Sequence, residues 1–234
     1  MSVKLISVLA AAAIASASNA ALVYGGGTET GSRFNAGAGV ITYMNCFTAI
    51  DGTAAQNQLA VDSAIVGIRR LAAAGALTDV GIKIYAAEMT YDGTNFGRGA
   101  NYEIYSSASL GAGAASVTQL VNTGAVSGVT LNLETVSSAG LGGWWIGVEF
   151  TGANAANVAN GWRVMNAPTT GASLNGFGVY NNAGSGVFAA FFVFGTPPGS
   201  SPSRFMVDVN GTLVPTPGAI ALLGLAGLVG RRRR

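Results

Sequence analysis

The 234-residue sequence contains no histidine and only one cysteine, Cys46. Without an imidazole, a Ser-His-Asp or Cys-His catalytic arrangement lacks its general base, and a histidine-ligated zinc site lacks its ligand. A single thiol cannot close a disulfide within the chain. Because its neighbours are apolar, Cys46 is expected to be a buried, unreactive thiol, and an intermolecular bridge is the alternative.

Charge is also scarce, at 9% of the residues, and the formal net charge of +2 comes from the two ends of the chain. Residues 21–217 hold seven basic and ten acidic residues, so this part carries a formal charge of −3. A mildly acidic domain gives no reason to expect a nucleic acid as partner. The basic residues at the two ends instead indicate how those ends are oriented relative to a membrane.

The catalysis left open by these absences is that of paired carboxylates, as in glycosidases. Glu134 with Glu149, and Asp92 with Glu103, are the candidate pairs, although solvated surface carboxylates explain them equally well. Asp92 and Glu103 also have the first and twelfth positions of an EF-hand loop, but Phe96 stands where an oxygen ligand is needed. We therefore expect no catalytic residues, no metal site, no cofactor and no enzymatic activity.

Residues 1–20 have the three parts of an export signal. Lys4 supplies the positive start, residues 5–15 form an apolar run, and Ser18-Asn19-Ala20 is a small-x-small cleavage site. We predict cleavage by signal peptidase between Ala20 and Ala21, with Ala17 as the alternative site. A short N-terminal core helix is the competing interpretation.

The last 21 residues carry a second signal, which combines a proline-glycine segment, an apolar run and a basic end. The segment is Val214, Pro215, Thr216, Pro217 and Gly218, and the basic end is Arg231, Arg232, Arg233 and Arg234. As a helix, the run at 219–230 would span roughly 18 Å, against roughly 30 Å of bilayer hydrocarbon. Since arginines stay on the cytoplasmic side, this tail predicts a short, oriented and temporary membrane anchor.

The order of these parts resembles the PEP-CTERM sorting signal of exported bacterial proteins. The resemblance implies recognition and cutting by an exosortase-type membrane enzyme near residues 215–218. Thr216 stands where the family usually has glutamate. An ordinary membrane anchor, or an apolar tail that is not processed, is the alternative.

The middle of the chain has the pattern of an all-β domain. We predict one jelly-roll-like β-sandwich over residues 21–211, a linker and sorting motif at 212–218, and flanking helices at 1–20 and 219–234. Ten strands are expected, with an all-apolar stretch at 187–194 buried on both faces. They are 39–49, 60–70, 80–88, 102–106, 116–123, 129–135, 144–151, 176–180, 188–194 and 204–209. Asn210-Gly211 is expected to be a turn, and residues 209–217 an exposed linker.

A second resemblance rests on Gly143-Trp144-Trp145-Ile146-Gly147-Val148-Glu149-Phe150 and on Tyr91-Asp92-Gly93 and Tyr105 before it. These segments are similar to jelly-roll or galactose-binding-like sandwiches found on PEP-CTERM surface proteins. The resemblance implies that fold and suggests contact with sugars or a matrix.

Trp144 and Trp145 are neighbours on a predicted strand, so their side chains must point to opposite faces. An exposed indole is a flat platform for a sugar ring. Trp144, Trp145 and Trp162 are therefore the candidate carbohydrate contacts, and core positions are the alternative.

Together these features predict an exported protein, briefly anchored in the inner membrane and then placed at the cell surface or in the extracellular matrix. Its role is expected to be structural or adhesive. Its expected partners are signal peptidase, an exosortase-type enzyme and extracellular polysaccharide. A carbohydrate-binding module is the alternative function, followed by a glycoside hydrolase or lyase.

Overall fold

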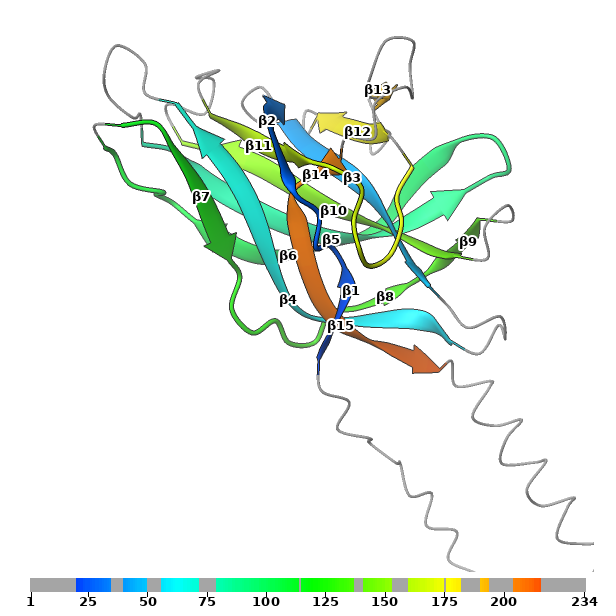
Figure 1. Ribbon diagram of the computed structural model, residues 1–234. Coiled ribbons are helices and arrows are strands. Elements are labelled where there is room, and N and C mark those ends of the chain that lie inside the picture. Colours follow the sequence, from blue (N-terminus) through cyan, green and yellow to red (C-terminus); the bar gives the residue numbers. More distant parts are fainter. Residues whose placement is uncertain are drawn as a thin grey trace, which may run out of the picture.

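The structure is a computed structural model that describes residues 20–34, 40–49, 56–71, 79–113, 115–136, 141–152, 160–174, 176–181, 190–193 and 204–215. Every regular element in these ranges is a β-strand, and the strands form two antiparallel sheets (Figure 1). The predicted all-β class is confirmed, and the two sheets are consistent with a sandwich. The helices predicted at 1–20 and 219–234 lie outside the described residues, apart from Ala20.

The first sheet has eight strands, with β4 at its centre. Its path is β1-β15-β4-β11-β14, while β7 and β8 also pair with β4, and β2 pairs with β11. The strands are β1 (Ala21–Tyr24), β2 (Glu29–Phe34), β4 (Gln56–Arg70), β7 (Val117–Asn122), β8 (Thr130–Asn132), β11 (Asn160–Met165), β14 (Arg204–Phe205) and β15 (Val207–Pro215). With 15 residues, β4 is long enough to pair with strands from four distant parts of the chain.

The second sheet has seven strands in the order β13-β12-β3-β10-β5-β6, and β9 pairs with one end of β10. Its strands are β3 (Val40–Ala49), β5 (Gly81–Tyr91), β6 (Phe96–Ser107), β9 (Glu134–Val136), β10 (Leu141–Thr151), β12 (Gly176–Asn181) and β13 (Ala190–Val193). Strand β13 falls in the apolar stretch predicted to be buried on both faces. Among the described strands it ends the path of its sheet, pairing only with β12.

One large apolar core joins the two sheets. Along β10 the side chains of Trp144, Ile146, Val148 and Phe150 enter this core, as strict alternation requires. They meet residues of β4 such as Ile68 from the opposite sheet. Burying each large apolar side chain contributes about 1.5–3 kcal/mol, so this layer is the main source of stability.

A second, smaller apolar cluster covers the outer face of the seven-stranded sheet. It contains Tyr43, Phe47 and Trp145, and glycines of β10 make room for its rings. A Cβ at Gly147 would lie 2.6 Å from a ring carbon of Tyr43, and one at Gly143 would lie 3.0 Å from Phe47. The glycines of the Gly-Gly-Trp-Trp-Ile-Gly segment therefore let aromatic rings of β3 lie against the β10 backbone.

The last strand corrects two predictions. Asn210 and Gly211 are part of β15, at a register shift opposite β4, rather than a turn. A Cβ at Gly211 would lie 2.6 Å from the carbonyl oxygen of Ala60, so this glycine serves a close strand approach. The predicted linker is also wrong up to Pro215, because residues 212–215 pair with β4 and Leu213 packs against the core.

Candidate functional sites

The predicted sorting motif begins inside the folded domain. Val214 pairs with Gln58 and Pro215 with Gln56, at the end of the ladder between β15 and β4. Thr216, Pro217, Gly218 and the four terminal arginines lie outside the described residues. Strand β15 thus holds the first two motif residues.

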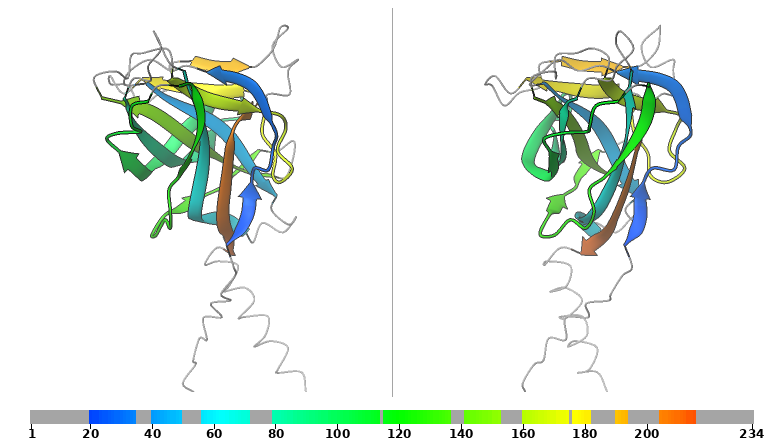
Figure 2. Two further views of the ribbon diagram at one scale, coloured as in Figure 1. Left: turned by 60° about the vertical axis from the view of Figure 1, so that its left-hand side comes forward. Right: turned by 90° about the vertical axis from the view of Figure 1, so that its left-hand side faces the viewer.

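The predicted signal-peptidase site directly precedes the first strand. Ala20 is exposed, and Ala21 opens β1 by pairing with Gly211 of β15. Because β1 and β15 are adjacent and antiparallel, the start of one and the end of the other lie at the same end of the domain (Figures 1 and 2). The two predicted processing sites therefore adjoin a single end of the sandwich.

An open depression lies beside Ala20. It is lined by Asp62, Ser63, Asn122 and the segment 124–126, and the Asp62 carboxylate accepts a 3.4 Å hydrogen bond from the Thr212 hydroxyl. The lining contains one carboxylate and short polar groups. This set does not provide paired acid and base groups for catalysis.

The three tryptophans are all buried, with exposed fractions of 0% for Trp144 and Trp145 and 1% for Trp162. Trp144 lies in the main core and its Nε1 donates to the Thr48 hydroxyl at 2.9 Å. Trp162 stacks on Phe205, with 4.5 Å between ring centroids.

Trp145 points to the opposite face from Trp144, as predicted, but it is covered. Its Nε1 donates to the carbonyl of Gly97 at 2.9 Å, and its ring meets Phe96 edge-on. Both partners belong to β6, so the first part of the β5–β6 hairpin covers this indole. The expected exposed sugar platform is therefore wrong for all three tryptophans.

The candidate carboxylate pairs do not converge. Glu134 pairs with Gly143 and Glu149 lies six residues further along β10, which is about 20 Å for an extended strand. Glycosidase carboxylates lie roughly 5–9.5 Å apart. The proposed Glu134–Glu149 pair is therefore wrong.

Asp92 and Glu103 have separate partners. Asp92 Oδ1 accepts hydrogen bonds from the backbone amides of Thr94 and Asn95, at 2.9 and 2.7 Å, and these bonds lower the pKa of its carboxyl group. Glu103 forms an ion pair of 2.8 Å with Lys83. The EF-hand-like spacing is thus a hairpin turn followed by a cross-strand ion pair.

A polar network lies among the aromatic residues on the outer face of the seven-stranded sheet. The Tyr85 hydroxyl donates to Glu149 at 2.7 Å, and the Tyr43 hydroxyl donates to Asn101 while accepting from Arg98. Burial, followed by the bond to Glu149, raises the pKa of Tyr85 well above its ordinary value. These bonds tie β3, β5, β6 and β10 together and satisfy polar groups that are largely buried.

The outer face of the eight-stranded sheet carries a cluster that the sequence analysis missed. In the strand register, Arg33 of β2 lies directly opposite Arg163 of β11. On the other side of β11, Arg69 of β4 lies opposite Gly161, which is two residues before Arg163. We call Arg33, Arg69 and Arg163 the arginine face. No local sequence motif predicts the arginine face, because its three residues are far apart in sequence. They become neighbours only through the strand order β2-β11-β4.

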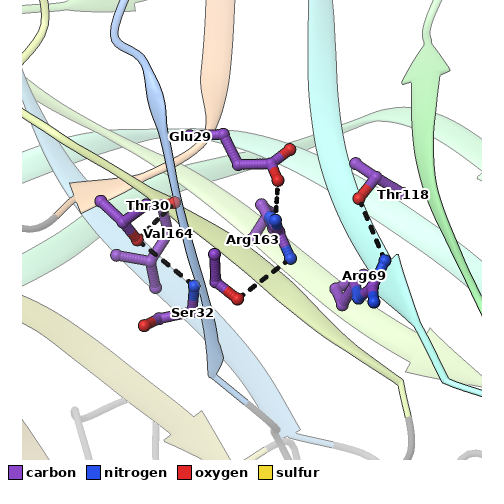
Figure 3. A network of polar contacts seen from close by, with 8 residues as sticks. Glu29, Thr30, Ser32, Arg69, Thr118, Arg163 and Val164 are labelled. Atoms are coloured by element: carbon purple, nitrogen blue, oxygen red, sulfur yellow. Dashed lines mark hydrogen bonds and ion pairs between the residues drawn. The ribbon is translucent and has the colours of Figure 1, made fainter.

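The central arginine of this face is held in place (Figure 3). Arg163 forms an ion pair with Glu29 and donates to the carbonyl oxygen of Gly31 at 3.2 Å. Its side chain is 6% exposed, and burial lowers the pKa of the guanidinium from its ordinary value. Arg69 is half-buried and its guanidinium lies 3.5 Å from the hydroxyl of Thr118.

Cys46 is buried in the main core, and burial raises the pKa of its thiol well above the ordinary value. This is the environment that the apolar neighbours predicted. The thiol is not placed to act as a nucleophile, because it is enclosed and protonated.

Within the described ranges, no group of three His, Cys, Asp or Glu side chains is placed to hold a metal ion. No helix in the same ranges is long and apolar enough to cross a membrane, and residues 219–230 are not among them. Comparisons with protein-family models, curated proteins and solved structures found no match to this chain.

Proposed function

We propose that this chain is an exported, non-enzymatic surface or matrix protein that is sorted through its C-terminal tail. Its leader would be removed between Ala20 and Ala21. The tail would hold the domain briefly at the inner membrane until an exosortase-type enzyme cuts near Pro215–Gly218. The proposal includes a jelly-roll-like topology for the sandwich.

The observation that carries the proposal is the pairing of the first and last strands. Ala21 lies opposite Gly211, so the segments bearing the two sequence signals leave the domain at one end. A domain that is tethered to one membrane, first by a leader and then by a tail, needs both ends on the membrane side. The strand order satisfies this requirement.

The end of β15 also suits the predicted cut. The ladder with β4 ends at Pro215, and 216–218 follow directly. Cleavage after Thr216 or Pro217 would leave every pairing of β15 in place. The released domain would therefore keep its fold.

A structural or adhesive role is favoured over the enzymatic alternative by the separation of the carboxylates. Glu134 and Glu149 are too far apart for glycoside hydrolysis, and Glu103 is paired with Lys83. The carbohydrate-binding alternative loses the basis on which the sequence suggested it, because all three tryptophans are buried.

The test is the double variant Pro215→Ala/Pro217→Ala, with Pro168→Ala as the matched control in a loop away from the tail. In the native host, the wild type and the control should appear outside the inner membrane in a shortened form. The double variant should stay in the membrane fraction at the size that retains the tail. If the double variant keeps the size and destination of the wild type, the sorting proposal fails.

A further inference from the structure

Strand β7 forms an edge of the eight-stranded sheet (Figure 1), and among the described residues it pairs with β4 alone. The amide of Thr123, directly after β7, donates to the carbonyl oxygen of Ala64 in β4 at 2.9 Å. Because inward and outward backbone groups alternate along an antiparallel ladder, Thr118, Leu120 and Asn122 turn their amides and carbonyls away from β4. The outer edge of β7 therefore presents the hydrogen-bonding groups of these three residues.

The side chains of β7 do not block this edge. The strand reads Val-Thr-Gln-Leu-Val-Asn, without a charged residue or a proline, and its pairing with β4 has no register shift. Leu120 is 58% exposed and Val117 is 40% exposed. Edge strands usually carry charges, prolines or bulges that prevent pairing with another chain. An exposed, uncharged segment of high β-propensity without them is suited to accept an added strand.

The other strands at the margins of the two sheets differ from β7. Strands β2 and β6 each contain both an acidic and a basic residue. Strands β1, β8, β9, β13 and β14 have four residues or fewer. Within the described ranges, β7 is therefore the marginal strand that combines six residues with the absence of charge.

The outer edge of β7 is complementary to the same edge of a second copy. When two such strands run antiparallel about a twofold axis at Leu120, this residue lies opposite its counterpart, and Thr118 lies opposite the partner's Asn122. All three outward positions then form hydrogen-bonded pairs of the antiparallel ladder, with two N–H···O=C bonds in each pair. The leucines contact each other at the centre, and the polar side chains meet on either side. A twofold interface requires this kind of self-complementarity.

The distribution of charge also allows this edge to meet itself. Arg69 and Arg70 lie on β4, one strand behind β7. In a paired sheet, β4 and the partner's β4 would be three strand spacings apart, or roughly 14 Å, which exceeds the screening length of about 8 Å in physiological salt. No charge on β7 selects a partner of another kind. A second copy matches the edge at every outward position.

We propose that two copies of this domain associate through β7, so that their eight-stranded sheets become one continuous sheet. The contact is small for a protein interface, and we expect a weak dimer with a dissociation constant of about 10 µM to 1 mM. Such a contact acts where the protein is concentrated, as on a membrane or in a matrix. The inference goes beyond the proposed function and does not depend on the sorting step.

The test measures the mass in solution of the protein recovered from cells, in a concentration series up to about 1 mM. The wild type should change reversibly from monomer to dimer. Leu120→Lys places two ammonium groups opposite each other in the dimer and should weaken association about tenfold. Leu174→Lys is the matched control, because Leu174 is also exposed, at 43%, and lies outside the strands. It should associate as the wild type does, and both variants should keep the melting temperature of the wild type.

A cysteine variant locates the contact. Cys46 is the single thiol of the chain and is buried, so Leu120→Cys adds the one accessible thiol. In the proposed dimer the two added thiols lie on directly opposite residues, whose Cβ atoms are about 5 Å apart. A short thiol-specific crosslinker should therefore give a covalent dimer. Leu174→Cys should stay monomeric under the same conditions.

The proposal is overturned if the wild type stays monomeric throughout the series, or if Leu120→Lys associates as strongly as Leu174→Lys. Species larger than a dimer would also overturn it and would indicate stacking of exposed strands in place of a closed pair. Equal crosslinking of the two cysteine variants would place the contact away from β7. All variants have the same tail, so association through the tail cannot separate Leu120→Lys from Leu174→Lys.

Discussion

At the scale of single residues, several glycines stand where a neighbouring ring or strand lies too close for a β-carbon. Gly147 shows this most clearly, because the ring of Tyr43 occupies the space of a β-carbon there. The hydroxyl group of Tyr43 donates a hydrogen bond to Asn101 and accepts one from Arg98, and these two bonds fix the position of the ring. The ring thus links the backbone of β10 to β6.

We predict that Gly147→Ala destabilises the domain by about 1–3 kcal/mol, the usual effect of overpacking a filled site. The added methyl group would lie 2.6 Å from Tyr43, which is held on both sides. Gly99→Ala is the control, because its nearest contact would be the Glu88 side chain at 3.2 Å. Chemical denaturation measures both variants, and an equal loss of stability in the two would contradict the packing described here.

A second prediction at this scale concerns alkaline pH. Burial is the leading cause that raises the pKa values of Cys46, Tyr24 and Tyr85 above their ordinary values of 9.0 for the thiol and 10.0 for the phenols. Because the folded state keeps these groups protonated, their contribution is complete below the unfolded pKa values and is lost as pH rises above them. The free energy of unfolding should therefore decline above about pH 9.

The measurement is the denaturation midpoint at several pH values from neutral to alkaline. Cys46→Ala should remove the part of the decline that begins near the thiol's unfolded pKa and leave the part due to the tyrosines. A midpoint that does not change through the titration range of free cysteine and tyrosine would contradict the burial of these groups.

At the scale of elements, β15 connects the fold to the tail. It pairs with β4 from Val207 to Pro215 and with β1 along its other edge. Leu213 adds a core contact near the end of the strand. The last five residues of β15 therefore belong to the domain even though the sequence suggested a linker.

A chain that ends at Pro217 should unfold at the same temperature as the full-length protein, because every β15 pairing is retained. A chain that ends at Asn210 should be markedly less stable, since it loses the pairings of residues 211–215 and the contact of Leu213. Thermal unfolding of the two truncated chains makes the comparison. Equal melting temperatures would show that the end of β15 contributes nothing to the fold.

The other strands differ in how well a local sequence pattern could predict them. The alternation in 129–133 located β8, and the strand predicted at 144–151 falls within β10, one face of which enters the apolar core. The single strand predicted at 129–135 is wrong, because β8 pairs with β4 while β9 pairs with β10 of the other sheet.

Strands β1, β2 and β11 were not predicted. In β2, Phe34 is the one apolar side chain, so the strand form depends on its pairing with β11. Strand β11 does place Trp162 and Val164 in the core, but a pattern this short was not recognised. Asn210-Gly211 has the composition of a turn, but here it marks a strand irregularity fixed by contact with β4.

The candidate sites were less predictable than the strands, because they depend on contacts between segments that are distant in sequence. Adjacent residues such as Trp144 and Trp145 must face opposite sides of a strand, and this was correct. The burial of Trp145 depends on the β5–β6 hairpin, whose register shifts are not visible in a local pattern. The arginine face depends on strand order across nearly the whole chain.

At the scale of the whole molecule, the strand order gives the domain two different ends. The first and last strands meet at one end, where both predicted processing sites adjoin the fold (Figure 2). The arginine face lies along β4 away from that end.

The most direct test of this account is the intact mass of the protein recovered from outside the cell, measured beside that of the membrane fraction. The account predicts an external form that begins at Ala21 and ends near Pro217, and a membrane form that is heavier by the tail. An external form that still carries residues 218–234 would contradict it, because the tail would then be a permanent part of the protein.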